Sequence, residues 1–249
     1  GTGTTSVGVI GTGTEIAALS IGSAENGGIT LNGAIVTDGA VTIDGPVTLA
    51  TGAISVTTGD NALTFNHSID GGQALTLVSG TAATAVQGTI GGTTAITSLT
   101  ATNTTAAGTM EFSNIEGVTG ATAVGNTNTV TITLDGTAYS TAGAQTYTAK
   151  TGGGNIDITG AAATFTTTNA NIGFATSGVD LANNGTTTIN TGAGAGTVTF
   201  GAALETNGGD NDLLVVTSGT GDVTFTGAIG ATNALGGLSV NASAGDGDI

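Results

Sequence analysis

Short segments in which an apolar, a polar and an apolar residue follow one another recur along the whole chain, and this pattern restricts the fold more than any other feature. The segments are Val41-Thr42-Ile43, Val47-Thr48-Leu49, Ile54-Ser55-Val56, Leu63-Thr64-Phe65, Leu75-Thr76-Leu77, Val130-Thr131-Ile132, Ile156-Asp157-Ile158, Val198-Thr199-Phe200 and Val223-Thr224-Phe225. A period of two places alternate side chains on opposite faces of an extended backbone. Each segment is therefore predicted to be a β-strand with one buried face.

Residue pairs typical of tight turns separate these segments. Examples are Asp38-Gly39, Asp44-Gly45, Gly59-Asp60, Asp70-Gly71 and Asn184-Gly185. We expect such pairs to supply the positive-φ backbone of corners. Pro46, the only proline, lies between two segments, where a missing N–H costs no hydrogen bond between strands. Charged residues are only 7% of the chain, against roughly 25% in an average domain, so helices with charged outer faces are not expected.

The charge balance excludes several classes of partner. The chain has seventeen acidic residues and one basic residue, Lys150, which gives a formal net charge of −16. A surface with one cation cannot neutralise a row of phosphates, so we expect no nucleic-acid partner and no binding to anionic lipids. The sequence holds no apolar window long enough for a membrane helix, no signal-like opening segment and no cysteine. We therefore expect a mature form or an excerpt, with no membrane insertion.

One motif occurs three times, at residues 8–21, 88–101 and 227–240. All three copies fit Gly-x-Ile-Gly, four residues, Ile or Leu, two residues, and Leu followed by Ser or Thr. The matched positions are Gly8, Ile10, Gly11, Ile16, Leu19, Gly88, Ile90, Gly91, Ile96, Leu99, Gly227, Ile229, Gly230, Leu235 and Leu238. We expect these residues to have a structural role in a repeat architecture.

The spacing of the copies leads to a predicted architecture. The copies lie 80 and 139 residues apart, and both spacings are close to multiples of about 20. We therefore predict an all-β, right-handed parallel β-solenoid with coils of about 20 residues, where a coil is one full circuit of the chain. The solenoid is expected to run through residues 1–249 as one continuous segment. An antiparallel sandwich is the alternative, but it gives no reason for repeats at multiples of one length.

The two ends of the chain resemble each other. Residues 1–30 align with residues 219–249, including SAENGGI at 23–29 and SAGDGDI at 243–249. The chain is therefore expected to begin and end at the same phase of its repeat. Bare ends of a solenoid expose unpaired backbone groups that recruit other strands. We expect self-association into fibres or continuation of a longer chain.

Three stretches carry a resemblance to a known group of proteins. GTIGGTTAITSLT (88–100), TAGAQTYTA (141–149) and TGDVTFTGAIG (220–230) resemble repeats of filamentous-haemagglutinin-like and other large β-strand-repeat bacterial surface adhesins. The resemblance implies a β-helical stalk at the bacterial cell surface, with a role in adhesion, biofilm or extracellular filaments. It also implies cell-surface or matrix glycans as candidate partners. It assigns no catalytic residue.

Catalysis is not expected from the residues themselves. His67, the only histidine, is followed in sequence by Ser68 and Asp70, but neighbours on a strand point in alternating directions and cannot form a triad. The pair Asp210 and Asp212, or Asp222 with an acid on a neighbouring coil, could serve a polysaccharide-cleaving enzyme. The sequence lacks the basic and aromatic residues that such grooves use to hold sugars. We predict no enzyme activity.

Two further alternatives remain open. Asp210, Asp212, Asp246 and Asp248 could supply oxygen ligands to Ca²⁺, although their spacing fits neither the EF-hand loop nor the Gly-Gly-x-Gly-x-Asp nonapeptide repeat. No other cofactor is expected. Thr-x-Thr pairs, as at 129–133, 164–168 and 224–226, could order water and bind ice. Because the pairs do not recur in every coil at one phase, the preferred hypothesis is a secreted, non-enzymatic structural module.

Overall fold

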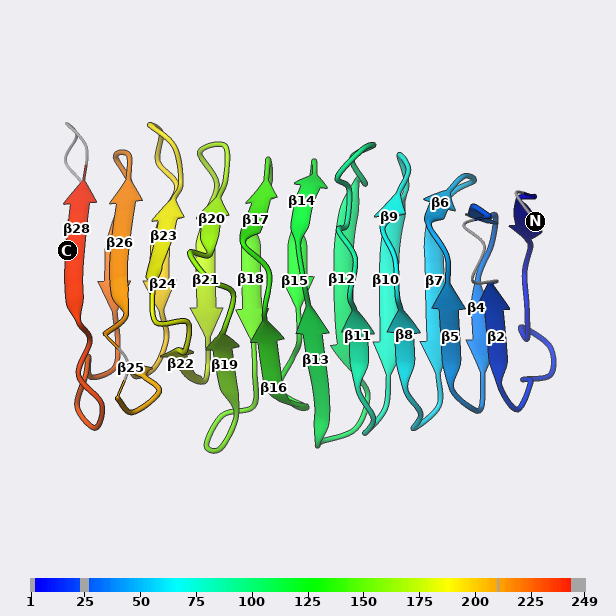
Figure 1. Cartoon of the computed structure of the whole chain (residues 1–249), viewed down its shortest axis with the longest axis horizontal. Helices are drawn as coiled ribbons and strands as arrows, with labels where there is room; N and C mark the ends of the chain where they lie inside the picture. Colours follow the sequence, from blue (N-terminus) through cyan, green and yellow to red (C-terminus); the bar gives the residue numbers. More distant parts are fainter. Residues whose placement is uncertain (1–2, 23–26, 210, 243–249) are drawn as a thin grey trace.

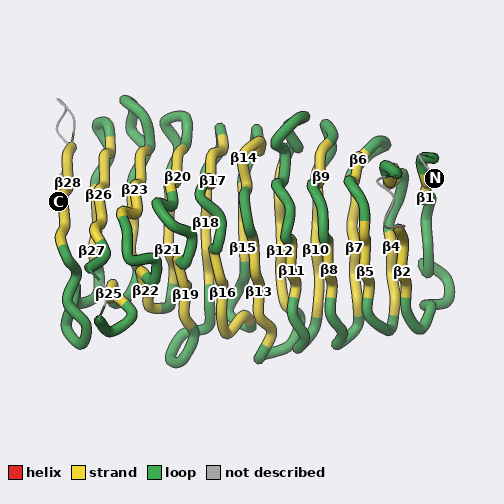
Figure 2. The backbone as a smooth tube through the Cα atoms, viewed as in Figure 1, coloured by secondary structure: helices red, strands yellow, loops and turns green. Residues whose placement is uncertain are grey.

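The computed structural model describes residues 3–22, 27–209 and 211–242. Its described residues form 28 β-strands and no helix. The strands make three parallel ladders, named here sheets A, B and C, which the chain visits in that order along each coil (Figures 1 and 2). The fold is a parallel β-solenoid of about 10 coils, so the stack is about 45–50 Å long at ~4.8 Å per coil.

The strands of each sheet follow one another along the stack. Sheet A contains β1 (Thr5–Val7), β3 (Ile29–Leu31), β6 (Val47–Leu49), β9 (Ile69–Asp70), β14 (Ile115–Val118), β17 (Ala138–Thr141), β20 (Thr164–Thr166), β23 (Thr186–Asn190), β26 (Leu213–Ser218) and β28 (Gly237–Ala242). Sheet B contains β4 (Ile35–Thr37), β7 (Ile54–Thr58), β10 (Ala74–Ser79), β12 (Ser98–Asn103), β15 (Thr122–Val124), β18 (Gln145–Thr148), β21 (Ile172–Ala175), β24 (Val198–Phe200) and β27 (Val223–Phe225). Sheet C contains β2 (Leu19–Gly22), β5 (Val41–Asp44), β8 (Leu63–Phe65), β11 (Thr84–Val86), β13 (Gly108–Phe112), β16 (Thr129–Leu134), β19 (Asn155–Ile158), β22 (Gly178–Leu181) and β25 (Leu204–Thr206). Ile90 bridges Ile69 and Ile115 and so joins the two parts of sheet A.

The sequence prediction of a β-solenoid is confirmed, but the coil is longer than the predicted 20 residues. One coil takes about 24 residues. Individual steps range from 18 residues, between paired Ile29 and Val47, to 27, between paired Ile189 and Val216. Most strand pairs stay in register, apart from shifts in β13–β16 and β14–β17. The strands vary from two to six residues, and the corners vary in length as well.

The three motif copies lie in different sheets, which explains why their spacing in the sequence predicts too short a coil. Ile10 pairs with Ile35 of sheet B, Ile90 belongs to the sheet A ladder, and Ile229 pairs with Leu204 of sheet C. The copies therefore lie on three different faces, and their spacings cover non-integral numbers of coils. The unit that recurs is one strand with its corner, about a third of a coil. For the same reason the two chain ends are not at the same phase, because β1 lies in sheet A and the aligned β27 in sheet B.

Inward positions form one continuous core. Along sheet A the paired residues Ile115, Tyr139, Phe165 and Ile189 stack on one another, and all are fully buried. A second stack runs along sheet B through Tyr147, Phe174, Phe200 and Phe225, with ring centroids 5.0 to 5.4 Å apart. The parallel in-register pairing places like residues above one another, so the aromatic rings stack face to face.

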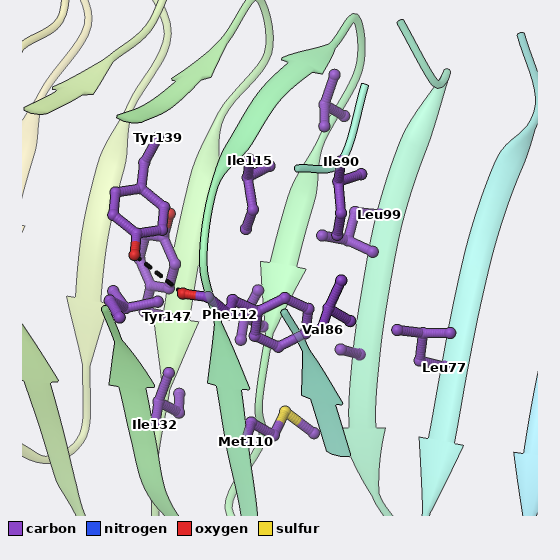
Figure 3. Close-up of a cluster of buried hydrophobic side chains, with 14 of the residues drawn as sticks. Leu77, Val86, Ile90, Leu99, Met110, Phe112, Ile115, Ile132, Tyr139 and Tyr147 are labelled. Carbon is purple, nitrogen blue, oxygen red and sulfur yellow. Dashed lines mark hydrogen bonds between the residues drawn. The ribbon is translucent and has the colours of Figure 1, made fainter. Parts of the chain in front are cut away.

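Buried hydroxyls and amides in the core are held by hydrogen bonds. Tyr139 Oη donates to the Phe112 carbonyl at 3.0 Å (Figure 3) and accepts from Gly136 N at 2.9 Å. At the corner between sheets B and C, Asn103 Nδ2 donates to Ser79 Oγ at 2.8 Å, and Thr129 Oγ1 donates to Asn103 Oδ1 at 2.7 Å. This buried polar stack ties three consecutive coils together, and it satisfies groups that would otherwise destabilise the core.

Glycines serve the corners in two ways. Gly71 has a φ of +118° and Asn184 a φ of +51°, as predicted for the Asp-Gly and Asn-Gly pairs. Gly39, Gly45 and Gly59, in contrast, do not have positive φ, so the prediction is wrong for these three pairs. A Cβ on Gly39 would lie 1.6 Å from the Ala17 carbonyl oxygen of the preceding coil. At this corner glycine is required because neighbouring coils approach too closely for any side chain.

A buried charge in the sheet A ladder should open the stack. Ile90 is fully buried, and Ile90→Asp would place an unpaired carboxylate between two coils. We expect a loss of roughly 3–5 kcal/mol in the free energy of unfolding, measured by urea denaturation. Thr146→Asp, at an exposed outward position of sheet B, is the control and should change stability by less than about 1 kcal/mol. Equal effects of the two variants would contradict the assigned inward and outward faces.

Candidate functional site

The repeated motif forms a corner that the three copies share. Gly11, Gly91 and Gly230 all have positive φ, at +74°, +73° and +60°. In the second and third copies the first glycine of the motif passes close to the preceding coil: a Cβ on Gly88 would lie 2.2 Å from the carbonyl carbon of His67, and one on Gly227 would lie 2.3 Å from that of Ala202. A Cβ on Gly8, in the first copy, would meet nothing within 4 Å. The motif is therefore a backbone device that redirects the chain from one sheet to the next, as its predicted structural role requires.

An acidic residue of the preceding coil holds the motif loop in two copies. Asp70 Oδ1 accepts hydrogen bonds from the backbone N–H groups of Thr93 and Thr94, at 2.8 and 3.0 Å. Glu205 accepts from the N–H groups at the equivalent positions 232 and 233, at 3.2 and 2.9 Å. In the first copy, the equivalent loop borders a cavity of about 460 Å³. These carboxylates therefore have a structural use, which sequence reasoning missed because the partners lie one coil away.

The burial of the apolar motif side chains depends on how far along the stack of coils each copy lies. In the second copy Ile90, Ile96 and Leu99 are fully buried. In the third copy Ile229 is 39% and Leu238 43% exposed, and in the first copy the equivalent side chains are only partly buried. A residue of this motif is thus covered only when coils lie on both sides of it.

Sheet C carries a row of acidic side chains. Asp157 pairs in register with Asp180, which pairs with Glu205, so three successive coils present an acid at one outward position. Asn155 Nδ2 donates to Asp157 Oδ1 and, at 2.7 Å, to Asp180 Oδ2. Partial burial raises the pKa of Asp157, the Asp180 charge raises it further, and the Asn155 hydrogen bond opposes both effects. The row concentrates negative charge on this face.

The side chains of His67, Ser68 and Asp70 are not brought together in the structure. His67 Nε2 lies 3.4 Å from Asp44 Oδ1, and both side chains are 44% exposed. Its sequence neighbours Ser68 and Asp70 contribute no bond to it, since the Asp70 carboxylate holds a loop of the next coil. Lys150 is exposed in the loop after β18. The His67 and Asp44 pair is a surface contact between two corners of sheet C.

Of the four predicted calcium ligands, Asp212 lies within the described residues. Asp210, Asp246 and Asp248 lie outside the described residues. Asp212 is fully buried at the corner before β26, where its Oδ1 accepts from Gly185 N at 3.0 Å. Within residues 3–22, 27–209 and 211–242, no group of three or more His, Cys, Asp or Glu side chains is placed to hold a metal ion. The calcium alternative gains no support from the residues that can be placed.

The Thr-x-Thr pairs singled out in the sequence lie on different faces. Thr131 and Thr133 belong to sheet C, Thr164 and Thr166 to sheet A, and Thr224 to sheet B. On sheet A, Thr166 Oγ1 donates to Ser140 Oγ at 2.7 Å. These three groups of Thr-x-Thr pairs therefore do not form one array. Sheet B contains further threonines besides Thr224.

Comparison with known proteins adds no relative. No family model, no curated protein and no solved structure matches the chain. The described residues also include no helix that is long and apolar enough to cross a membrane. Interpretation of function therefore depends on the geometry and on the resemblance noted above.

The corner glycine of the motif should tolerate no side chain. In Gly91→Ala, alanine would adopt a left-handed φ, and its Cβ would lie 2.2 Å from the Gly117 carbonyl oxygen. We expect a loss of at least about 2 kcal/mol in the free energy of unfolding. Gly72→Ala is the matched control, because a Cβ there meets nothing within 4 Å. A Gly91→Ala variant as stable as the control would show that the corner relaxes freely.

The acidic row should make stability depend on pH. Because the pKa of Asp157 is raised in the folded chain, the folded state binds more protons than the unfolded state above the ordinary value of 3.8. Stability should therefore fall as the pH rises from about 4 through the folded pKa. Asp157→Asn should reduce this fall and increase stability at neutral pH, measured by urea denaturation between pH 3 and 8. An unchanged slope in the variant would contradict the assigned cause.

Proposed function

We propose that the chain is a non-enzymatic structural module of a bacterial surface adhesin or extracellular filament. The observation that carries the proposal is the set of three parallel ladders that run the length of the stack. Each coil contacts only its neighbours, so further coils can be added without changing the design. A rod of this kind holds a binding tip away from a surface or forms part of a filament.

The mechanical role follows from the direction of the backbone hydrogen bonds. In a parallel solenoid these bonds lie along the rod axis, and every coil joins the next through all three sheets. The stacked core adds side-chain contacts in the same direction, as between Tyr147, Phe174 and Phe200. A load along the axis is shared by many bonds at each interface. The acidic outer surface of sheet C keeps such a rod soluble and separate from its neighbours.

The distribution of side chains supports a role without catalysis. Sugar-cleaving grooves place carboxylates beside groups that bind and orient substrate. Here the two tyrosines and five of the six phenylalanines are fully buried in the core. The chain's one lysine lies on a loop rather than on the sheet C face with Asp157 and Asp180. The extracellular location and the adhesive or filament role derive from the sequence resemblance.

Assembly end to end is part of the proposal. The end strand β28 pairs with β26 through one edge. Near this edge, a cavity of about 210 Å³ is lined by Leu213, Leu214, Val215, Gly237, Leu238 and Ser239. Leu238 occupies an inward position, since its partner Leu214 is fully buried, yet it is 43% exposed. A coil of a second copy, or a further coil of a longer chain, would cover this side chain and extend the sheet A ladder.

This assembly predicts a concentration-dependent change in size. Sedimentation velocity of the purified chain should show species larger than the monomer as concentration rises, because end-to-end contacts bury Leu238. Leu238→Asp should abolish the larger species, since it places a charge in the ladder. Ser239→Asp, on the outward side of the same strand, is the control and should retain them. A wild-type chain that stays monomeric at the highest concentration would count against assembly from copies of this chain.

A further inference from the structure

The outer face of sheet B differs from the other two faces in its charge. Acidic residues occur within strands of sheets A and C, as at Asp70, Glu111, Asp157, Asp180 and Glu205. The nine strands of sheet B carry no ionisable residue apart from the buried Tyr147. In a chain with a formal charge of −16, the strands of sheet B thus form a neutral band along the rod, with charged residues such as Asp38, Asp60 and Asp222 only at the corners beside it.

Hydroxyl groups recur along this neutral face in register. One outward row consists of Ser55, Thr76, Thr100, Ala123, Thr146, Gly173, Thr199 and Thr224. Six of these eight positions bear a hydroxyl, and successive positions are separated by one coil, ~4.8 Å. A second outward row, two residues further along the chain, contains Thr57, Val78, Thr102, Thr148 and Ala175. Together the two rows form a grid of hydroxyl and methyl groups.

The hydroxyls of this grid are available to an outside partner. Across the described part of the chain, no side-chain hydrogen bond to protein involves Ser55 or the threonines of the two rows. On the other faces some polar groups are used internally, as in the Thr166 to Ser140 bond on sheet A and the Asn155 bonds to carboxylates on sheet C. Threonines without such a bond also occur on sheet C, as at Thr133, but there they lie beside acidic side chains such as Asp157. The sheet B hydroxyls therefore face solvent with both donor and acceptor capacity.

These observations limit the kind of partner. A second protein surface would strip water from the row of hydroxyls, which is unfavourable unless each finds a new partner. A sugar chain is commonly held by aromatic or charged side chains, and the sheet B aromatics Tyr147, Phe174 and Phe200 are buried beneath the face. A surface made of ordered water satisfies every hydroxyl and meets no charge. We propose that the outer face of sheet B binds ice.

Binding to ice requires only the fixed arrangement of hydroxyl and methyl groups on this face. The rigid backbone ladder holds the hydroxyls at regular positions, so that they replace water molecules of a crystal surface, while the threonine methyl groups fill the spaces between them. No group moves and no bond is made or broken covalently. A rod adsorbed in this way stops growth of the ice surface beneath it and lowers the freezing point relative to the melting point. This activity is independent of the proposed filament role.

The test is ice growth in the presence of the purified chain. Thermal hysteresis should be measured by nanolitre osmometry, together with inhibition of ice recrystallisation. The wild-type chain should show both effects. Thr100→Lys and Thr146→Lys, on either side of Ala123 in the row, should each lose them, because a long charged side chain prevents close contact with the ice surface. Thr133→Lys adds the same charge to sheet C and should retain both effects.

Two results would overturn the proposal. The first is a wild-type chain with no hysteresis and no inhibition of recrystallisation at its highest soluble concentration. The second is activity that survives in both sheet B variants, which would show that the outer face of sheet B is not the ice-binding surface. Thermal denaturation of each variant, followed by circular dichroism, shows whether the fold is retained. Two separate positions keep the test valid if one substitution unfolds the chain.

Discussion

The pairing of each strand with the strand one coil away is the interaction on which the rest of the structure depends. A backbone N–H or carbonyl that is buried without a hydrogen-bond partner destabilises the folded state. In this chain the partners lie 18 to 27 residues apart in sequence. Once the ladder forms, like positions stack on like positions. The aromatic stack on sheet B, the buried Asn103 corner and the outward hydroxyl rows are all consequences of this one register.

The close approach of coils explains the composition. With coils only ~4.8 Å apart, corners such as Gly39 and Gly91 lie against carbonyl groups of neighbouring coils and leave no room for a Cβ. The interior has space for one side chain per inward position, which is why aliphatic residues and a few stacked rings fill it. Polar residues are accepted inside where a neighbouring coil supplies the bond, as Ser79 does for Asn103.

Much of the local structure could be predicted from the sequence, because a period of two is a local signal. Each of the nine alternating segments lies within a strand, from Val41–Ile43 in β5 to Val223–Phe225 in β27, and Pro46 lies at the corner between β5 and β6. The coil length could not be predicted, because the motif copies occupy three different sheets and corner length varies. The hydrogen bonds of Asp70 and Glu205 could not be predicted either, because their partners lie on the next coil and come close only when the coils stack.

The central claim is that the backbone ladders run along the rod axis with about 24 residues per coil. Electron cryo-microscopy of the native material, with averaging of aligned rods or filaments, tests it most directly. The account predicts a strong axial periodicity near ~4.8 Å, with three sheets around a filled core in cross-section. A periodicity of that size perpendicular to the long axis, or a two-layered cross-section, would contradict the solenoid and the mechanical role built on it.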